Sequence, residues 1–153
     1  MRVYRISKCN FISDPSGTGA ALYGGRWNSR GTYMVYTAAT PSLALLESVV
    51  HISSIKATGY CMICLEIPDN SIATITINNL PQNWFVYPPP DALQSIGDNF
   101  IQQNEYLALK LPSVIMPEES NYLLNPKHQL FNQIKTLYIR TIPIDERLVR
   151  NSG

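Results

Sequence analysis

A chain of 153 residues with 45% hydrophobic and 15% charged residues has the composition of one globular domain, which excludes an intrinsically disordered protein. Twelve Lys and Arg against eleven Asp and Glu leave a net charge of +1, which argues against direct binding to nucleic acid. No stretch reaches the roughly 18 consecutive apolar residues of a membrane span, and the N-terminal residues lack the apolar core of a secretion signal. We therefore expect a single cytoplasmic domain over residues 1–153 with no membrane segment.

The first half of the chain predicts two strands and one helix. Residues 1–7, MRVYRIS, alternate in polarity and predict a strand. A polar loop rich in Gly, Ser and Pro follows, and residues 32–38, TYMVYTA, predict a second strand. Thr40 and Pro41 are typical of a helix N-cap and of the first helical position, so we expect a helix over residues 42–51.

The second half of the chain predicts more strands than helices. One helix begins at Asp91, is interrupted at Gly97 and resumes to about Gln103, and a second begins at Asn125-Pro126 and runs through Ile134. Strands are expected at residues 60–67, 72–77 and 135–142, and on both sides of Pro112. Because strands outnumber helices and do not alternate strictly with them, the predicted fold class is α+β rather than a doubly wound sheet.

Three cysteines, Cys9, Cys61 and Cys64, are an odd number and too few for a disulfide framework. Cys61 and Cys64 form a C-x-x-C pattern, but they lie in a predicted strand, where residues three apart point to opposite faces. No second such pair and no spaced His pair completes a tetrahedral metal site. We expect reduced, buried cysteines and no metal.

Glu47 occupies the apolar stripe of the predicted helix over residues 42–51. It shares the i, i+3, i+4, i+7 spacing with Leu43, Leu46 and Val50. A carboxylate withdrawn from water costs free energy unless it is hydrogen-bonded or paired, and functional sites are where such carboxylates collect. A glutamate that simply reaches solvent from the edge of the stripe would give the same pattern.

Arg26 follows two glycines in the segment GGRWN. Glycines let a backbone approach a ligand closely, and a guanidinium can bind two oxygens of a phosphate or carboxylate at once. No G-x-G-x-x-G or G-x-x-x-x-G-K-[ST] accompanies it, and a surface arginine stacked on Trp27 would look the same. With no G-x-S-x-G or other nucleophile motif beside a histidine, the residues alone predict a domain that holds a small anion-bearing ligand.

Three segments, read in order, carry a resemblance to a known family. They are GAALYGGRWNSRGTYMVYTAATPSLALLESVVH, IGDNFIQQNEYLALKLPSVIMPEESNYLLNPKHQLF and the terminal IDERL. Together they resemble the RES-domain family, the toxin half of bacterial Xre-RES toxin–antitoxin pairs, over nearly the whole chain. One departure is that this chain has Gly97-Asp98-Asn99-Phe100 where the family commonly shows GDxW, so the aromatic bulk is kept and the indole donor is lost.

The resemblance implies a set of site residues. The arginine, glutamate and serine of the family name fall on Arg26, Glu47 and Ser113. Tyr36 in VYTA matches the site tyrosine of the family, and Asn125 in LLNP matches a polar position near the site.

The resemblance also implies a fold and an activity. The family's fold is similar to that of ADP-ribosyltransferases, so we expect a split mixed or antiparallel sheet core. Its activity is the destruction of NAD+ by cleavage of the nicotinamide–ribose glycosidic bond, with water or phosphate as acceptor. NAD+ is then a substrate and no cofactor is expected. A cognate Xre-type helix-turn-helix antitoxin is the implied partner, in a higher-order and growth-arresting toxin–antitoxin system.

Roles for the site residues follow from that chemistry as expectations. Glu47 would stabilise the oxocarbenium-like centre that forms when a neutral nicotinamide leaves. Arg26 would bind phosphate oxygens, with Gly25 admitting the dinucleotide. Tyr36 would stack against the nicotinamide or its ribose, and Ser113 would hydrogen-bond near the nicotinamide end.

Three other functions fit parts of the sequence. An ADP-ribosyltransferase that modifies a macromolecule would share all of these residues. A non-catalytic interaction module could use Arg26 and Glu47 as a structural ion pair. A ribonuclease toxin is less favoured, because the charge is near neutral and no paired histidines are present.

Overall fold

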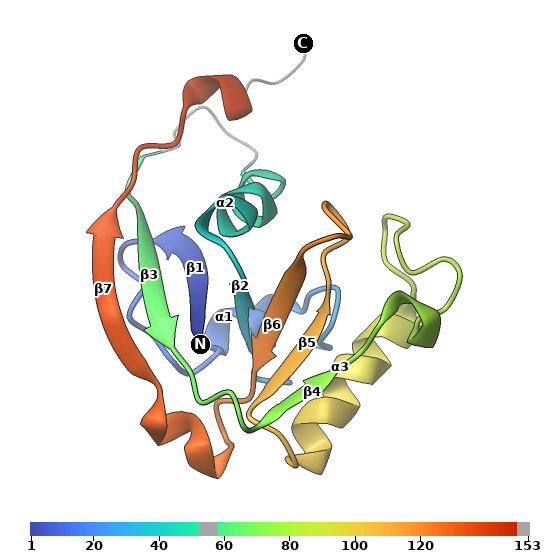
Figure 1. The fold of residues 1–153 in the computed structure, drawn as a ribbon. Coiled ribbons are helices and arrows are strands. Elements are labelled where there is room, and N and C mark those ends of the chain that lie inside the picture. Colours follow the sequence, from blue (N-terminus) through green and yellow to red (C-terminus); the bar gives the residue numbers. More distant parts are fainter. Residues whose placement is uncertain (53–57, 150–153) are drawn as a thin grey trace.

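A seven-stranded mixed sheet, in the order β4-β5-β6-β2-β1-β3-β7, is the frame of the molecule (Figure 1). The computed structural model describes residues 1–52 and 58–149, so residues 53–57 and 150–153 of the predicted domain lie outside the described part. Only β4 and β5 are parallel; every other neighbouring pair is antiparallel. The strands are β1 (Arg2–Lys8), β2 (Val35–Ala38), β3 (Tyr60–Glu66), β4 (Ile72–Thr74), β5 (Ala108–Pro112), β6 (Ser120–Leu124) and β7 (Lys135–Thr141).

The sheet is split between β1 and β2. A single residue pair, Tyr4 with Ala38, joins these two strands, whereas β1 pairs with β3 along its whole length from Arg2 to Lys8. The group β1, β3 and β7 therefore diverges from the group β2, β6, β5 and β4, as Figure 1 shows. The predicted α+β class and the split mixed sheet are confirmed.

Six helical segments complete the fold of residues 1–52 and 58–149. Three are α-helices and three are 3-10 segments: α1 (Thr18–Tyr23), α2 (Pro41–Val49), α3 (Asp91–Gln103), η1 (Ile77–Asn79), η2 (Gln129–Gln133) and η3 (Glu146–Leu148). Within the described ranges, no helix is both long enough and apolar enough to cross a membrane.

The helix α2 forms as its sequence predicts. The Thr40 side chain caps it by accepting a hydrogen bond of 3.1 Å from the Leu43 backbone N–H, and Pro41 occupies the first turn. Leu43 and Ala44 are buried and pack with Ala38, so α2 lies against the β1–β2 region of the sheet. The helix ends at Val49, two residues before the predicted end.

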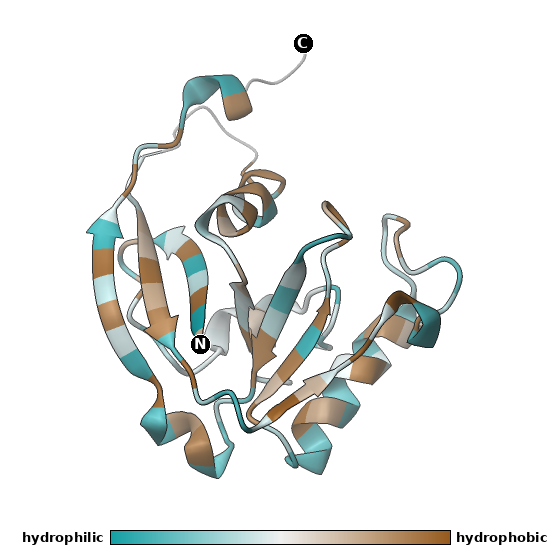
Figure 2. Ribbon diagram, in the orientation of Figure 1, coloured by the Kyte–Doolittle hydropathy of each residue, from teal (hydrophilic) through white to brown (hydrophobic). Residues whose placement is uncertain are grey.

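The helix α3 is continuous, so the predicted interruption at Gly97 is wrong. Gly97 is buried in the middle of the helix and faces the backbone of Trp27, where there is no room for a Cβ. Leu93 and Phe100 are buried in the core beside it, and Figure 2 shows the alternation of apolar and polar residues along this helix. Glycine is therefore present for close packing and not as a helix breaker, and Phe100 still fills an aromatic core position.

Three further predictions of secondary structure need correction. The Gly- and Ser-rich loop contains the short helix α1. The segment after Pro112 leaves the sheet at Ser113, and the antiparallel partner of β5 is β6. The cap-like Asn125-Pro126 signal leads into a turn and then only the 3-10 segment η2 instead of an α-helix.

The prediction of reduced cysteines is wrong for two of the three. Cys9 and Cys61 form a disulfide, because Cys9 directly follows β1 while Cys61 lies in β3 opposite Ser7 of β1. The Cys9 backbone N–H also donates to the Gly59 carbonyl at 2.8 Å, which fixes this end of the strand pair. Cys64 is a free, buried thiol, so the two cysteines of the C-x-x-C pattern do diverge.

Candidate functional site

One face of the sheet carries the predicted site. Tyr36 and Ala38 of β2 pair with Leu123 and Asn121 of β6, and residues two apart on a strand share a face, so these four side chains lie on the same side. The core cluster of α2 includes Ala38, and that of α3 includes Leu123, so both helices cover this face. Figure 1 shows α2, the β5–β6 loop and the long loop before α3 at one end of the molecule.

Glu47 is held by two hydrogen bonds from two different segments. Its Oε1 accepts from Ser113 Oγ at 2.7 Å and from Asn121 Nδ2 at 2.6 Å. Ser113 follows β5 directly, and Asn121 is the second residue of β6. The structure therefore brings together the predicted glutamate and the predicted serine, which are 66 positions apart in the sequence.

Ser113 is fully buried and its hydroxyl is completely engaged. Its Oγ accepts hydrogen bonds of 3.1 Å from the backbone N–H groups of Ile115 and Met116. With two donors at the oxygen, the hydroxyl proton is directed to Glu47. Two donors on one oxygen suit an ionised carboxylate, which only accepts hydrogen bonds.

The segment GGRWN is folded around the buried side chain of Asn28. The Tyr36 hydroxyl donates to Asn28 Oδ1 at 2.7 Å and accepts from the Trp27 backbone N–H at 3.1 Å. Asn28 Nδ2 donates to the carbonyl oxygens of Ala20 and Thr32 at 2.8 and 3.1 Å. Burial raises the pKa of Tyr36 well above its ordinary value, so the phenol stays protonated as the donor that this network needs.

Gly25 is the residue that allows this network to form. A Cβ at this position would lie 2.8 Å from the Tyr36 hydroxyl oxygen and 3.0 Å from Asn28 Oδ1, so a larger residue would compete with the hydrogen bond between them. Gly25, which precedes Arg26, therefore has a packing role against Tyr36 and Asn28.

Arg26 spans from this segment to the loop before α3. Its Nη1 donates to the carbonyl oxygens of Trp84 and Val86 at 2.9 and 3.2 Å, whereas Nε and Nη2 make no hydrogen bond to the described part of the chain. Burial lowers the pKa of Arg26, and the negative charge of Glu47 opposes this shift, which places both charges in one electrostatic environment. Glu47 and Arg26 make no direct ion pair in the described residues.

Two side chains of the helix α3 hydrogen-bond to the GGRWN segment and to Ser29, which follows it. Gln94 Nε2 donates to the carbonyl oxygens of Gly25 and Asn28 at 3.0 and 3.2 Å. The Asp98 carboxylate accepts from the backbone N–H and the hydroxyl of Ser29 at 2.9 and 2.5 Å. Burial raises the pKa of Asp98, but the hydrogen bonds from Ser29 outweigh it and hold the pKa below its ordinary value.

Asn125 lies away from these residues. It is fully buried at the far end of β6, four residues beyond Asn121 and therefore about 13 Å along the strand. Its Nδ2 donates to Asn104 Oδ1 at 2.7 Å and its Oδ1 accepts from the Lys127 backbone N–H at 3.0 Å. Both polar atoms of the side-chain amide thus hold the loops at that end of the sheet.

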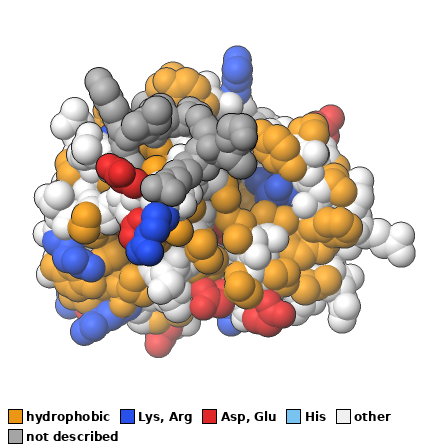
Figure 3. All heavy atoms as spheres, turned by 90° about the horizontal axis from the view of Figure 1, so that it is seen from above, with side chains coloured by type: hydrophobic (Ala, Val, Ile, Leu, Met, Phe, Trp, Pro, Cys, Tyr) orange, Lys and Arg blue, Asp and Glu red, His pale blue; other side chains and the backbone are white. Residues whose placement is uncertain are grey.

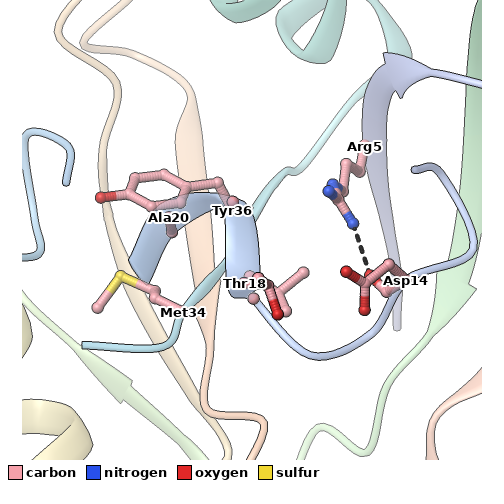
Figure 4. A pocket seen from close by; sticks show the side chains of 9 residues that line it. Arg5, Asp14, Thr18, Ala20, Met34 and Tyr36 are labelled. Carbon is pink, nitrogen blue, oxygen red and sulfur yellow. Dashed lines mark hydrogen bonds between the residues drawn. The ribbon is translucent and has the colours of Figure 1, made fainter. Parts of the chain in front are cut away.

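A hollow of about 90 Å³ lies beside Tyr36 and Arg5 (Figure 4). Arg5 donates to the Asp14 carbonyl at 3.0 Å, and burial lowers the pKa of its guanidinium. The remaining walls come from residues 17–20 and from Met34 and Val35. The volume is small compared with the roughly 300 Å³ or more of most ligand pockets, so it would accept only part of a dinucleotide.

A second hollow of about 320 Å³ lies between α3 and the β4–β5 edge of the sheet. Its apolar lining includes Ile75, Ile96 and Phe100. Neither hollow is lined by Glu47 or Arg26.

The end of the molecule that carries α2 and the β5–β6 loop is largely apolar. Figure 3, which looks down on this end, shows hydrophobic side chains gathered over much of the face, with charged side chains of both signs scattered among them. Three consecutive exposed residues, Phe85, Val86 and Tyr87, belong to the loop that Arg26 holds.

Sequence reasoning missed three polar residues that organise the site. Asn28 and Asn121 hold Tyr36 and Glu47, respectively, and Asp98 holds Ser29, which directly follows the GGRWN segment. Asn28 is the last residue of the segment GGRWN, but its zero exposure is a property of the tertiary fold. Within the described ranges, no group of three or more His, Cys, Asp or Glu residues is placed to hold a metal ion.

Comparison with known proteins gives matches over nearly the full length. Residues 2–147 match the family model described as RES domain. A protein named Toxin Res from Photorhabdus laumondii is 36% identical over an alignment of 156 residues that covers 98% of this chain and 98% of that protein. A protein named Prs ADP-ribosylating toxin from Sphingobium sp. is 38% identical over 144 residues, covering 91% of this chain and 89% of that protein.

One solved structure has a similar fold. A chain in the crystal structure of the M. tuberculosis MbcT-MbcA toxin–antitoxin complex superposes with a TM-score of 0.75 at 16% identity, covering 92% of this chain and 83% of that one. The similarity agrees with the expected ADP-ribosyltransferase-like fold.

Proposed function

Because this chain belongs to the RES domain family, we propose that it is the toxin of a toxin–antitoxin pair and that it destroys NAD+ by cleaving the bond between nicotinamide and ribose. The observation that carries the proposal is the Glu47 carboxylate, fixed by Ser113 and Asn121 on the face of the sheet that also carries Tyr36 and, in the same electrostatic environment, Arg26. Cleavage of a positively charged pyridinium glycoside needs a fixed carboxylate near the carbon on which positive charge develops.

The chemistry requires no general acid. When the glycosidic bond breaks, its electron pair goes to the pyridinium nitrogen, so nicotinamide leaves as a neutral molecule and positive charge develops on the ribose. A negative charge held near that carbon stabilises the transition state, and this is the role of Glu47. Water then adds to give ADP-ribose and a proton, or phosphate adds to give ADP-ribose 1″-phosphate.

Arg26 has two tasks in this mechanism. Its Nη1 fixes the loop around Trp84 and Val86, and its Nε and Nη2 are left to bind an anionic oxygen of the substrate. Tyr36 positions the same segment through Asn28, so its contribution is to hold Arg26 in place as well as to stack against the nicotinamide or its ribose.

The charge of Glu47 can be tested separately from its shape with Glu47→Gln. The glutamine carbonyl can still accept from Ser113 and Asn121, so the geometry is kept and only the charge is removed. We expect nicotinamide release from purified protein to fall by about 10²-fold or more with little change in thermal unfolding. Glu105→Gln, at an exposed acidic residue on the loop after α3, is the matched control. Turnover of Glu47→Gln within threefold of the parent would refute this role.

The acceptor defines the rival function. One relative is named as an ADP-ribosylating toxin, and a transferase would use the same site with a macromolecular acceptor. Labelled NAD+ incubated with the purified protein, with and without phosphate and with a cell lysate, separates the cases. Free ADP-ribose or its 1″-phosphate supports NAD+ destruction, whereas label retained on macromolecules supports transfer.

The partner proposed from the family is an Xre-type helix-turn-helix antitoxin in a higher-order complex. One similar fold comes from a toxin–antitoxin complex, which supports an antitoxin partner. Co-expression with a candidate Xre-type helix-turn-helix antitoxin should restore growth and yield a complex on size-exclusion chromatography.

A further inference from the structure

Asn121 stands beside the proposed catalytic carboxylate and no role is assigned to it by the RES pattern of arginine, glutamate and serine. It is the second residue of β6, and its backbone is paired with Ala38 of β2 on one side and Leu111 of β5 on the other. Its side chain therefore projects from a strand that is paired on both sides, whereas Ser113 lies in the loop after β5. Of the two donors to Glu47, Asn121 is the one on a rigid element.

The two donors meet at one oxygen of Glu47. Asn121 Nδ2 at 2.6 Å and Ser113 Oγ at 2.7 Å both reach Oε1, and Oε2 accepts no hydrogen bond from the described residues. Two donors from different directions fix the rotation of the carboxylate about its last bond. The oxygen that remains for a substrate is thereby always Oε2.

Asn121 provides this contact at a cost in stability. Its own Oδ1 is buried and has no hydrogen-bond partner among the described residues. A buried acceptor without a partner is unfavourable, and such groups in native proteins tend to mark functional positions. Rotating the amide by half a turn would not help, because Oδ1 would then face the Glu47 carboxylate and both are acceptors.

We infer that Asn121 is a positioning residue for Glu47, whose carboxyl group it holds with Oε2 turned toward the substrate. The inference rests on the proposed function of Glu47 and extends it by a residue that acts only through Glu47. It assigns to Ser113 and Asn121 a shared task that neither performs alone, since each supplies one of the two donors.

Replacing Asn121 by aspartate should make the site titrate. In Asn121→Asp, two carboxyl groups lie at hydrogen-bond distance and share one proton at low pH, where the protonated aspartic acid still donates to Glu47. As the pH rises, the shared proton is lost, the donor disappears and the two carboxylates repel. Turnover should thus be retained near pH 5 and lost toward pH 8.

Other charged groups around Glu47 are common to the parent and the variant. Arg26 faces it from the GGRWN segment, the phenol of Tyr36 stands on β2, and Glu119 precedes β6, where it accepts from Thr40 Oγ1 at the start of α2. Lys110 of β5 pairs with Tyr122, which places it on the other face of the sheet. A pH profile that differs between the two proteins therefore reports on the new pair.

The test compares kcat and KM for NAD+ between pH 5 and 8 in the parent, Asn121→Ala, Asn121→Asp and the control Asn99→Asp on the exposed side of α3. We expect Asn121→Ala to lower kcat about 10-fold to 100-fold with a KM within about threefold and an unchanged or higher Tm. We expect Asn121→Asp to lose about 10-fold in kcat between pH 5 and 8 relative to the parent, and Asn99→Asp to follow the parent. A kcat for Asn121→Ala within twofold of the parent, or parallel profiles for Asn121→Asp and Asn99→Asp, would overturn the inference.

A measurement without NAD+ separates this inference from the proposed function. In protein with ¹³C-labelled Glu and Asp side chains, the carboxyl resonances of Glu47 and of the new aspartate in Asn121→Asp should show the coupled titration of a pair that shares one proton. Independent titrations of the two groups would contradict the positioning role even if the enzyme is active. Absence of NAD+ cleavage by the parent protein, with the coupled titration observed, would contradict the proposed function alone.

Discussion

Replacing Gly97 by alanine should damage the contact between α3 and the segment that carries Arg26. A Cβ at this position would lie 2.8 Å from the Trp27 carbonyl carbon, closer still to its oxygen, and 3.1 Å from the Met34 side chain. The new Cβ would clash with the backbone of Trp27, and Gly97 itself lies in the interior of α3. The clash can therefore be relieved only by moving the whole helix or the segment that contains Trp27. Helix propensity acts in the opposite direction, since alanine is favoured over glycine inside a helix by about 1 kcal/mol.

Overpacking of this kind costs typically 1–3 kcal/mol, and a clash with backbone belongs at the upper end, so about 2 kcal/mol should remain after the gain in propensity. For a domain of this size, about 2 kcal/mol corresponds to a fall in Tm of roughly 4–8 °C. Gly19→Ala is the matched control, because Gly19 also lies in a helix and a Cβ there would meet nothing within 4 Å. Thermal and urea unfolding followed by circular dichroism would measure both. A Gly97→Ala protein that unfolds within 1 °C of the parent would show that the close approach of α3 to Trp27 is not real.

Two more predictions concern the polar contacts that hold the same segment. Tyr36→Phe leaves Asn28 Oδ1 without its donor and the Trp27 N–H without its acceptor. We therefore expect the free energy of unfolding, measured in urea, to fall by about 1–3 kcal/mol, and the KM for NAD+ to rise. Unchanged values for both would contradict the network. Asp98→Asn should cost about 1 kcal/mol at pH 7, because the carboxylate that accepts from Ser29 is partly exposed. Since the folded-state pKa of Asp98 is lowered, its contribution is present above the unfolded pKa of about 3.9 and is lost as the pH falls through the folded value, so the difference between the two proteins should shrink below about pH 4. A difference that stays constant from pH 7 to pH 3 would contradict that explanation.

Local signals were sufficient where one short segment decides its own conformation. The cap formed by Thr40 and the proline at position 41 place the start of α2 correctly, because the hydrogen bond they predict joins residues three apart. Alternating polarity places β1 and β7 within one residue of their observed ends, because this pattern too lies within one short segment. The hydropathy pattern of β7 is visible in Figure 2, although every residue of this strand is exposed.

Local signals failed where a distant contact reverses their meaning. Glycine is a poor helix former, and only the backbone of Trp27 on the opposite side of the contact explains why Gly97 stays helical. Cys9 and Cys61 are bonded because the β1–β3 pairing brings their ends together, and their count in the sequence says nothing about that pairing. Asn125 stays a predicted site residue, and only the course of β6 shows that it lies just beyond the end of the strand opposite to the Asn121 end.

The sequence by itself determined the α+β class and the family, because composition and ordered motifs are properties of the chain, and through the family resemblance it predicts Arg26, Glu47 and Ser113 as site residues. Only the tertiary structure decided how Glu47 is held, since Ser113 and Asn121 reach it across 66 and 74 positions. The same holds for Arg26, which fixes a loop almost 60 residues away through two carbonyl oxygens. A hydrogen bond depends on distance and direction in space, and a linear pattern does not contain either quantity until the sheet register is set.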